Sequence, residues 1–244
     1  MFYRQIGIAA IAAAALCTTL PAWGAEPRAV VELFTSQGCS SCPAADKLLG
    51  ELRRDPTVVA LSLPVDYWDY LGWKDTLALH SHSERQRDYS RTRGDREVYT
   101  PQVVVNGKVH ALGSDKAAIE RAIQQTRKSA DTLMLRVSLS VADGRVTVAS
   151  AAKGSGAGEV WLCAITKAVP VAIGRGENRG HTVTYYNVVR RWTKLGDWTG
   201  AAGNWSVPLA DIERDGADAV AVVIQSGNAP KPGTMLGAAF ASIR

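Results

Sequence analysis

The chain has 244 residues, an apolar content of 46% and a formal net charge of +5. This composition is typical of a globular protein with a hydrophobic core, and it excludes an intrinsically disordered chain. The densest group of basic residues, between positions 85 and 96, alternates with acidic residues. That mixture of signs does not favour a nucleic-acid-binding face, so we expect no nucleic-acid partner.

The first residues have the three parts of a secretory signal peptide. Arg4 supplies a positive charge, residues 6–16 form a short apolar run, and small residues precede Ala25. We therefore expect residues 1–24 to be removed on export, which places the mature protein in the periplasm or outside the cell. The alternative is a membrane anchor, which the alanines and Pro21 make only weakly apolar. We expect no stable membrane insertion after cleavage.

Residues 25–129 alternate between strand-like and helix-like segments. Apolar strands are expected at 29–34 and 57–65, and a helix at 44–54. A second helix, with Ser114 as its N-cap, is expected to run to residue 123. The polar stretch 75–93 predicts a helix and a loop. Asn106 and Gly107 between two apolar runs predict a β-hairpin, because both turn residues adopt positive φ.

Residues 130–244 have a different pattern, in which short strands are separated by Gly-rich stretches. We expect strands at 133–141, 145–150, 159–172, 182–191, 205–209 and 219–225. Such spacing is typical of an all-β sandwich or small barrel. The chain is therefore predicted to fold as an α/β domain followed by an all-β, sandwich-like domain, with the boundary near Ser129.

Cys39 and Cys42 form a Cys-x-x-Cys motif between the first predicted strand and the first predicted helix. At a helix N-terminus the free N–H groups and the helix dipole favour a thiolate, which is the nucleophile of disulfide exchange. We therefore predict that Cys39 attacks a substrate and that Cys42 resolves the mixed disulfide. The alternatives are a static disulfide or half of a metal site, which would need further ligands. We expect no cofactor and no resident metal.

Thr100 and Pro101, just before the predicted hairpin, resemble the cis-proline loop of the thioredoxin superfamily. The resemblance implies a thioredoxin-like fold for residues 25–129. It also implies that Pro101 is cis, faces the cysteine pair and, with Thr100, contacts the substrate. The tryptophan that precedes the first cysteine in thioredoxin is replaced by Gly38, which leaves the redox potential and the partners open.

Three segments together resemble a narrower family. They are residues 31–46 (VELFTSQGCSSCPAAD), 65–75 (VDYWDYLGWKD) and 99–107 (YTPQVVVNG), to which Asn187 near His181 is added. They are similar to secreted bacterial thioredoxin-like proteins catalogued as domain of unknown function 1223. The resemblance covers nearly the whole mature chain and implies the fold and export, but it implies little about the substrate.

Four further side chains are candidates for the site. Glu32 lies in the strand before the cysteines, where a buried carboxylate could take the proton of Cys42. The alternative is an outward-facing strand residue. Tyr67, Trp68 and Trp73 follow a strand end, where ligands gather in α/β folds, so they could receive a substrate. The alternative is aromatic packing between the two predicted domains.

Cys163 and His181 have no assigned role. Cys163 lies in an apolar run and is expected to be a buried small hydrophobe. His181 follows a polar loop and could line the site or lie on the surface.

Three functions remain open, and the oligomeric state is not predicted. The first is an exported thiol–disulfide oxidoreductase acting on protein or small-molecule thiols and disulfides. The second is a metal-binding or metal-delivery protein in which the same thiolates hold copper(I). The third is a non-catalytic binding protein with a structural disulfide.

Overall fold

The structure is a computed structural model that describes residues 26–243. The predicted signal segment, with Arg4, lies outside the described residues, so its removal stays a prediction. The described elements in chain order are β1 (Ala29–Thr35), α1 (Cys42–Leu52), β2 (Val58–Pro64), the 3-10 helix η1 (Asp69–Leu71), α2 (His80–Arg93), β3 (Gln102–Val105), β4 (Val109–Leu112), α3 (Lys116–Arg127), β5 (Val137–Ala142), β6 (Arg145–Ser150), β7 (Gly158–Ala172), β8 (Thr182–Trp198), β9 (Gly203–Pro208), α4 (Leu209–Glu213), β10 (Ala219–Asn228) and β11 (Lys231–Ser242).

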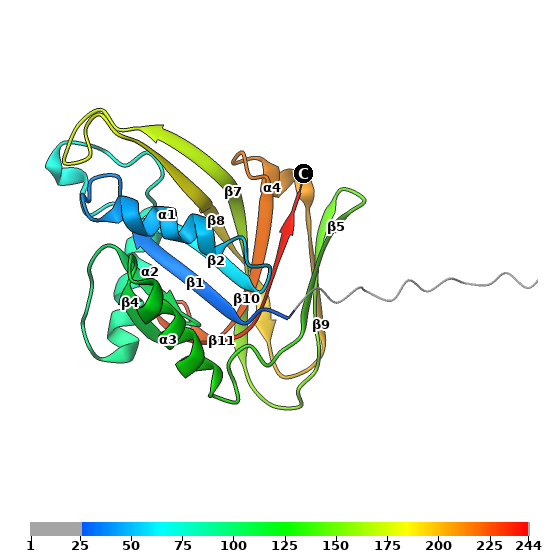
Figure 1. Cartoon of the computed structure of the whole chain (residues 1–244). Coiled ribbons are helices and arrows are strands. Elements are labelled where there is room, and N and C mark those ends of the chain that lie inside the picture. Colours follow the sequence, from blue (N-terminus) through cyan, green and yellow to red (C-terminus); the bar gives the residue numbers. More distant parts are fainter. Residues whose placement is uncertain (1–25, 244) are drawn as a thin grey trace, which may run out of the picture.

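Eight of these strands form one mixed sheet, in the order β11-β10-β7-β8-β2-β1-β3-β4 (Figure 1). β1 runs parallel to β2 and antiparallel to β3, whereas β8, β7, β10 and β11 are successive antiparallel neighbours. β2 and β8 meet at a single residue pair, Ser62 and Val188. Strands β5, β6 and β9 form a second, three-stranded sheet.

The predicted fold class is wrong. An α/β thioredoxin-like domain followed by an all-β sandwich would have separate sheets, whereas strands from both regions share the eight-stranded sheet. The physical reason lies in β2, which is buried along its whole length, so that its main-chain groups need partners on both edges. β1 occupies one edge; at the other, Val188 pairs with Ser62 and the Asn187 amide donates to the Ala60 carbonyl at 2.9 Å.

The domain boundary predicted near Ser129 falls in the connection between α3 and β5. The division of the chain into domains at that point stays a prediction.

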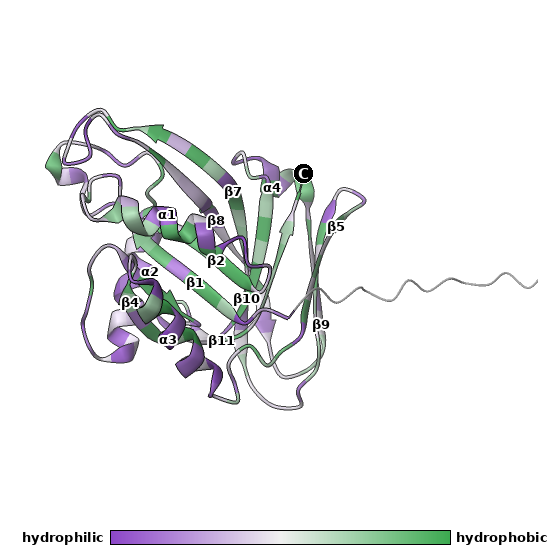
Figure 2. Ribbon diagram, viewed as in Figure 1, coloured by the Kyte–Doolittle hydropathy of each residue, from purple (hydrophilic) through white to green (hydrophobic). Residues whose placement is uncertain are grey.

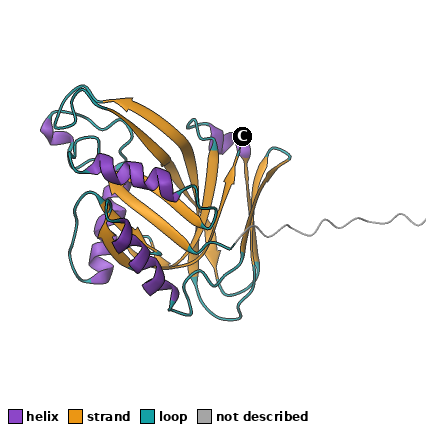
Figure 3. Cartoon of the chain, in the orientation of Figure 1, coloured by secondary structure: helices purple, strands orange, loops and turns teal. Residues whose placement is uncertain are grey.

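Helices cover both faces of the part of the sheet formed by β1, β2 and β3 (Figure 3). α1 and α3 pack on one face through residues that include Leu49 and Ile123. α2 packs on the other face, where Tyr89 joins a core built from β1, β2, β7, β10 and β11. The smaller sheet and α4 cover the part of the large sheet formed by β7, β10 and β11.

Hydropathy follows this layering (Figure 2). β1 and β2 are buried at every residue, as their nearly continuous apolar sequences predict for strands covered on both faces. α3 buries Ile119, Ala122 and Ile123 and turns its charged side chains to solvent. The helix is therefore amphipathic, as expected for one that covers a sheet.

The structure confirms a predicted hairpin turn, and it differs from the sequence-based expectation at a helix cap and at β11. The hairpin at Asn106 and Gly107 is confirmed, with φ of 52° and 72° at these residues. α3 is capped by Asp115 and not by Ser114, since the Asp115 carboxylate accepts a hydrogen bond from the Ala118 N–H at 2.9 Å. The sequence pattern does not predict β11, because its first residues, Lys-Pro-Gly at 231–233, are typical of a turn.

Candidate functional site

Cys39 and Cys42 form a disulfide at the start of α1, with 5.4 Å between their Cα atoms. β1 ends at Thr35, the chain turns, and α1 begins at Cys42 with Pro43 in its first turn, where a missing N–H costs nothing. Cys39 is 2% exposed and Cys42 is fully buried. The sequence therefore places the pair at the helix N-terminus as predicted, and the fold covers both sulfur atoms.

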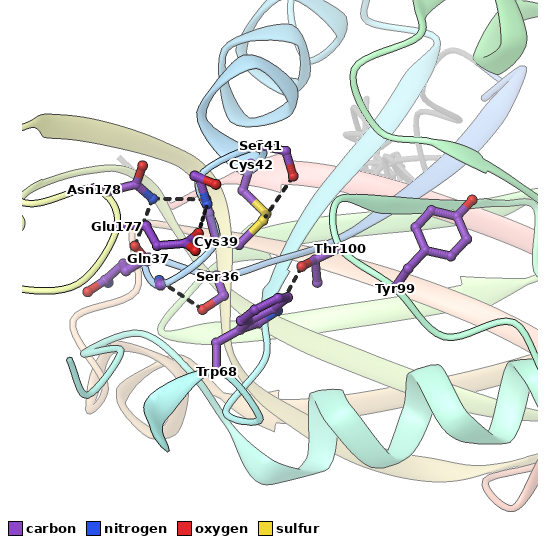
Figure 4. Close-up of a disulfide and its surroundings, with 12 residues drawn as sticks. Ser36, Gln37, Cys39, Ser41, Cys42, Trp68, Tyr99, Thr100, Glu177 and Asn178 are labelled. Atoms are coloured by element: carbon purple, nitrogen blue, oxygen red, sulfur yellow. Dashed lines mark hydrogen bonds between the residues drawn. A yellow bond between two sulfur atoms is a disulfide. The ribbon is translucent and has the colours of Figure 1, made fainter. Parts of the chain in front are cut away.

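The Thr100–Pro101 peptide bond is cis, which confirms the conformation that the resemblance implies. The side chain of Trp68 lies between this peptide and the cysteine loop: its indole N–H donates to Thr100 Oγ1 at 2.8 Å (Figure 4). A Cβ at Gly38 would lie 3.1 Å from Trp68 Cβ, so the absence of a side chain at Gly38 allows this close approach. Trp68 and Thr100 are therefore bonded to each other beside the cysteine loop, and their contact with a substrate stays a prediction.

The other two aromatic candidates lie in different surroundings. Trp73 donates its indole N–H to Gln37 Oε1 at 2.8 Å, so it braces the cysteine loop. Tyr67 donates to Gln86 Oε1 on α2 at 3.1 Å and packs against the core on that side of the sheet. Asp75, at the end of the same loop, accepts the Gln37 N–H at 2.8 Å, and its burial raises the pKa of its carboxyl group.

The connection between β7 and β8, which lies far from the cysteines in the sequence, contacts the cysteine loop (Figure 4). The Asn178 side-chain amide donates to the carbonyls of Gln37 and Cys39, both at 2.9 Å. Glu177 Oε2 accepts the Ser40 N–H at 3.1 Å. We call residues 173–181 the β7–β8 arm. The arm holds the cysteine loop through three hydrogen bonds.

Glu32 does not face the cysteine pair. Successive strand residues point to opposite faces, so Glu32 shares the α2 side of the sheet with Phe34, while Leu33 packs with α1. Glu32 is fully buried; it accepts hydrogen bonds from Arg85 Nε at 2.7 Å and from Tyr89 Oη at 2.6 Å. It is therefore neither exposed nor in contact with Cys42, and it forms part of a buried ion pair.

A different carboxylate lies on the side of Cys42. Asp46 follows Cys42 by four residues, which places both side chains on the same face of α1. Asp46 is 1% exposed, and neither carboxylate oxygen makes a well-formed hydrogen bond with the described residues. Burial raises its pKa well above the ordinary value, and the nearby Thr35 hydroxyl offsets only part of that rise.

Cys163 and His181 are now placed. Cys163 is a free, buried thiol whose pKa is raised by burial, which confirms its expected role as a small hydrophobe. His181 lines a cavity beside the cysteine loop together with Ser40 and Lys47.

Within residues 26–243, no three His, Cys, Asp or Glu side chains are grouped so that they could hold a metal ion. None of the helices in this range combines the length and the apolar character needed to cross a membrane.

Sequence reasoning missed Asp46, Glu177 and Asn178. Asp46 carries a signal that could have found it, since it is a charged residue on the apolar face of α1, one turn after Cys42. Glu177 and Asn178 carry none, because they contact residues that lie 137 to 141 positions earlier in the chain.

The chain is similar to two proteins of known structure and to one protein family. No curated protein matches the sequence. The crystal structure of protein AGR_C_4864 from Agrobacterium tumefaciens is 33% identical, with a TM-score of 0.81 over 89% of this chain and 95% of that one. HBP35 of Porphyromonas gingivalis is 13% identical, with a TM-score of 0.57 over 89% of this chain and 76% of that one, a likeness of fold alone. Residues 30–225 match the family described as "Protein of unknown function (DUF1223)", and the chain belongs to that family.

Proposed function

We propose that this protein is an exported thiol–disulfide oxidoreductase that exchanges disulfides with protein or small-molecule thiols through Cys39 and Cys42. The observation that carries the proposal is the disulfide at the start of α1, in whose surroundings Thr100, the first residue of the cis peptide before Pro101, is bonded to Trp68 (Figure 4). This local arrangement supports a redox site of the thioredoxin type. The disulfide also supports export, since such bonds persist in oxidising compartments such as the periplasm.

The exchange proceeds in two balanced steps. The Cys39 thiolate attacks one sulfur of a substrate disulfide, which forms a mixed disulfide and releases the other substrate sulfur as a thiolate. The Cys42 thiolate then attacks Cys39 Sγ, which forms the Cys39–Cys42 disulfide and releases the second substrate thiolate. The protein pair loses two electrons and the substrate gains them, and the reverse sequence oxidises a substrate dithiol.

Cys39 is the better candidate for the attacking thiol. It retains a small exposed area, whereas Cys42 has none. Ser41 Oγ lies 3.4 Å from Cys39 Sγ and can donate a hydrogen bond to a thiolate there.

Cys42 has to lose a proton before it can resolve the mixed disulfide. We assign Asp46 as the acceptor, in the role predicted for Glu32, because Asp46 shares the buried face of α1 with Cys42. Burial raises the pKa of Asp46 towards that of a thiol, so its ionised form, which is present above that pKa, is basic enough to accept the Cys42 proton.

One observation favours a second candidate function, a non-catalytic binding protein with a structural disulfide. Both cysteines are almost completely covered, and a substrate has to displace part of that cover to reach Cys39. The two candidates differ in whether the disulfide turns over.

A turnover assay separates them. The mature chain, in catalytic amount, is mixed with dithiothreitol and a fluorescence-quenched glutathione disulfide. We expect the wild type to accelerate reduction in proportion to its concentration, and Cys39→Ser and Cys42→Ser to abolish the acceleration. Cys163→Ser, the same change at the free thiol, should retain it. A wild-type protein that leaves the uncatalysed rate unchanged contradicts the proposal and supports the structural disulfide.

A further inference from the structure

The first residues of β8 have an edge on which the structure places no strand. β8 pairs with β7 from residue 182 onward, whereas β2 meets β8 only at Val188. Within the described chain, residues 182–186 therefore have a strand on one side alone. The β7–β8 hairpin carries this segment beyond the rest of the sheet, towards the start of α1 (Figure 1). An unpaired strand edge is a template for another extended chain.

The register shows which main-chain groups face this open edge. The Ile173 N–H donates to the His181 carbonyl at 2.9 Å, just beyond the last paired residues of the hairpin. In an antiparallel pair, hydrogen-bonded and non-hydrogen-bonded positions alternate. Counting from His181, residues 183 and 185 bond to β7, and residues 182, 184 and 186 direct their N–H and C=O groups away from it.

A proline confirms this alternation. Pro170 of β7 lies opposite Thr184. Proline has no N–H, so it is accommodated at a position whose main chain faces away from the neighbouring strand. The pair formed by Pro170 and Thr184 is thus a non-hydrogen-bonded one, and the Thr184 N–H is available on the open edge.

A groove of about 600 Å³ lies between these residues and the first turns of α1. Its α1 side is formed by Ser40, Pro43 and Lys47, and its β8 side by Thr182, Val183, Thr184 and Tyr186. One end reaches the cysteine loop at Ser40, where Glu177 and Asn178 also line it. The Tyr186 ring, which also lines the groove, lies against Gly50 of α1, where a Cβ would come within 2.4 Å of the ring.

We propose that this groove binds an extended segment of a polypeptide substrate as an additional strand on β8, and that it thereby presents a cysteine of that segment to Cys39. The inference rests on the proposed exchange at Cys39 and Cys42 and names the substrate class of that site. Five strand residues span roughly 16 Å, so the open edge pairs with a segment of about five residues.

The chemistry of the groove selects a polypeptide over a small thiol. Main-chain donors and acceptors that recur at every second residue are matched by another extended backbone, as in strand addition. The side chains carry both signs, Lys47 and Glu177, together with threonine hydroxyls. Because this mixture favours neither acidic nor basic peptides, hydrogen bonds between the two main chains supply the affinity. The sequence of the bound peptide can therefore vary.

Binding is tested apart from exchange. The Cys39→Ser, Cys42→Ser double variant is titrated with a fluorescein-labelled eight-residue peptide of alternating threonine and valine, with a lysine at each end and serine at the cysteine position. A series of peptides carries one N-methyl group at successive residues. We expect methylation at alternate residues to weaken binding about fivefold for each hydrogen bond lost, and methylation at the residues between to leave it unchanged. Absence of binding, or the same effect at every position, overturns the proposal.

A variant of the edge itself provides a second test. Thr184→Pro removes the open-edge N–H, whereas Thr184→Val retains it and serves as the matched control; thermal unfolding checks that both are folded. We expect Thr184→Pro alone to weaken peptide binding. If a second copy of the chain occupies the edge, the protein sediments as a dimer and the peptide does not bind, which overturns the proposal. Turnover of glutathione disulfide by the wild type tests the proposed function separately.

Discussion

Glu177 sets a negative charge against the start of α1, where it accepts the Ser40 N–H at 3.1 Å. The N-terminus of a helix stabilises negative charge. In the reduced protein, a Cys39 thiolate would share this positive end of the helix with the Glu177 carboxylate. The two charges repel each other, so we expect Glu177 to restrain the reactivity of Cys39.

Replacing this charge should therefore activate Cys39. We expect the reduced Glu177→Gln variant to react with iodoacetamide at neutral pH about two- to fivefold faster than the wild type, the effect of one charge at a helix end. Glu51→Gln, the same change in the last turn of α1, is the control and should leave the rate unchanged. Equal rates in all three proteins would show that the Glu177 carboxylate does not act on Cys39.

Asp46 should make stability depend on pH in a defined direction. Burial raises the pKa of its carboxyl group above that of the unfolded chain, about 3.9. Between pH 4 and the raised native pKa, the native state retains a proton that the unfolded state has lost, so the free energy of unfolding falls as the pH rises through this range. We expect Asp46→Asn to remove this fall, which urea unfolding between pH 4 and 8 measures. Parallel pH profiles of wild type and variant would contradict the assignment.

At the scale of elements, the contact between the β7–β8 arm and the cysteine loop is not predicted by the alternating strands and helices of residues 25–129. Asn178 is buried and satisfies two carbonyls of the cysteine loop at once. These contacts tie a hairpin late in the sequence to a turn early in it. The arm therefore orders the loop that carries Cys39.

Loosening the arm should expose the disulfide. Asn178→Ala removes two hydrogen bonds, each of which contributes about 1 kcal/mol. We expect a water-soluble phosphine to reduce the Cys39–Cys42 disulfide up to about thirtyfold faster in this variant. Arg175→Ala, an exposed change in the same arm, is the control. A rate that does not change in Asn178→Ala would show that other parts of the fold limit access.

Local chemistry made several features predictable. The Asn106-Gly107 hairpin, the helix that starts at Cys42 and the two buried strands before residue 65 follow from turn propensity and apolar runs. Trp68 and Thr100 were expected near the pair, and the structure joins them by a hydrogen bond. The sequence identifies the strand that carries Glu32, but it does not show on which face of the sheet the side chain lies. Asn178 was missed because no pattern links it to residues about 140 positions away.

At the scale of the whole molecule, the eight-stranded sheet joins the two regions that the sequence separates. One core contains Phe34 and Val104 from the first region together with Cys163, Ala221 and Met235 from the second. Turn spacing and glycine content indicate where strands end, but they do not indicate which strands pair with each other in a sheet. The sheet order was therefore beyond the reach of pattern reasoning.

The shared core predicts cooperative unfolding. We expect a single transition in urea, because neither region can lose its strands without exposing apolar side chains of the other. Tryptophan fluorescence and far-ultraviolet circular dichroism should give the same midpoint. Two separate midpoints would instead support independent domains on either side of Ser129.

The most direct test of the proposed exchange is the trapping of a mixed disulfide. Cys39→Ser and Cys42→Ser are each incubated with glutathione disulfide, and adducts are located by mass spectrometry after proteolysis. We expect Cys42→Ser to accumulate glutathione on Cys39, and Cys39→Ser to react much more slowly, because Cys42 is fully buried. Absence of an adduct on Cys39 in Cys42→Ser, or equal adduct formation on Cys42 in Cys39→Ser, would contradict the proposed exchange.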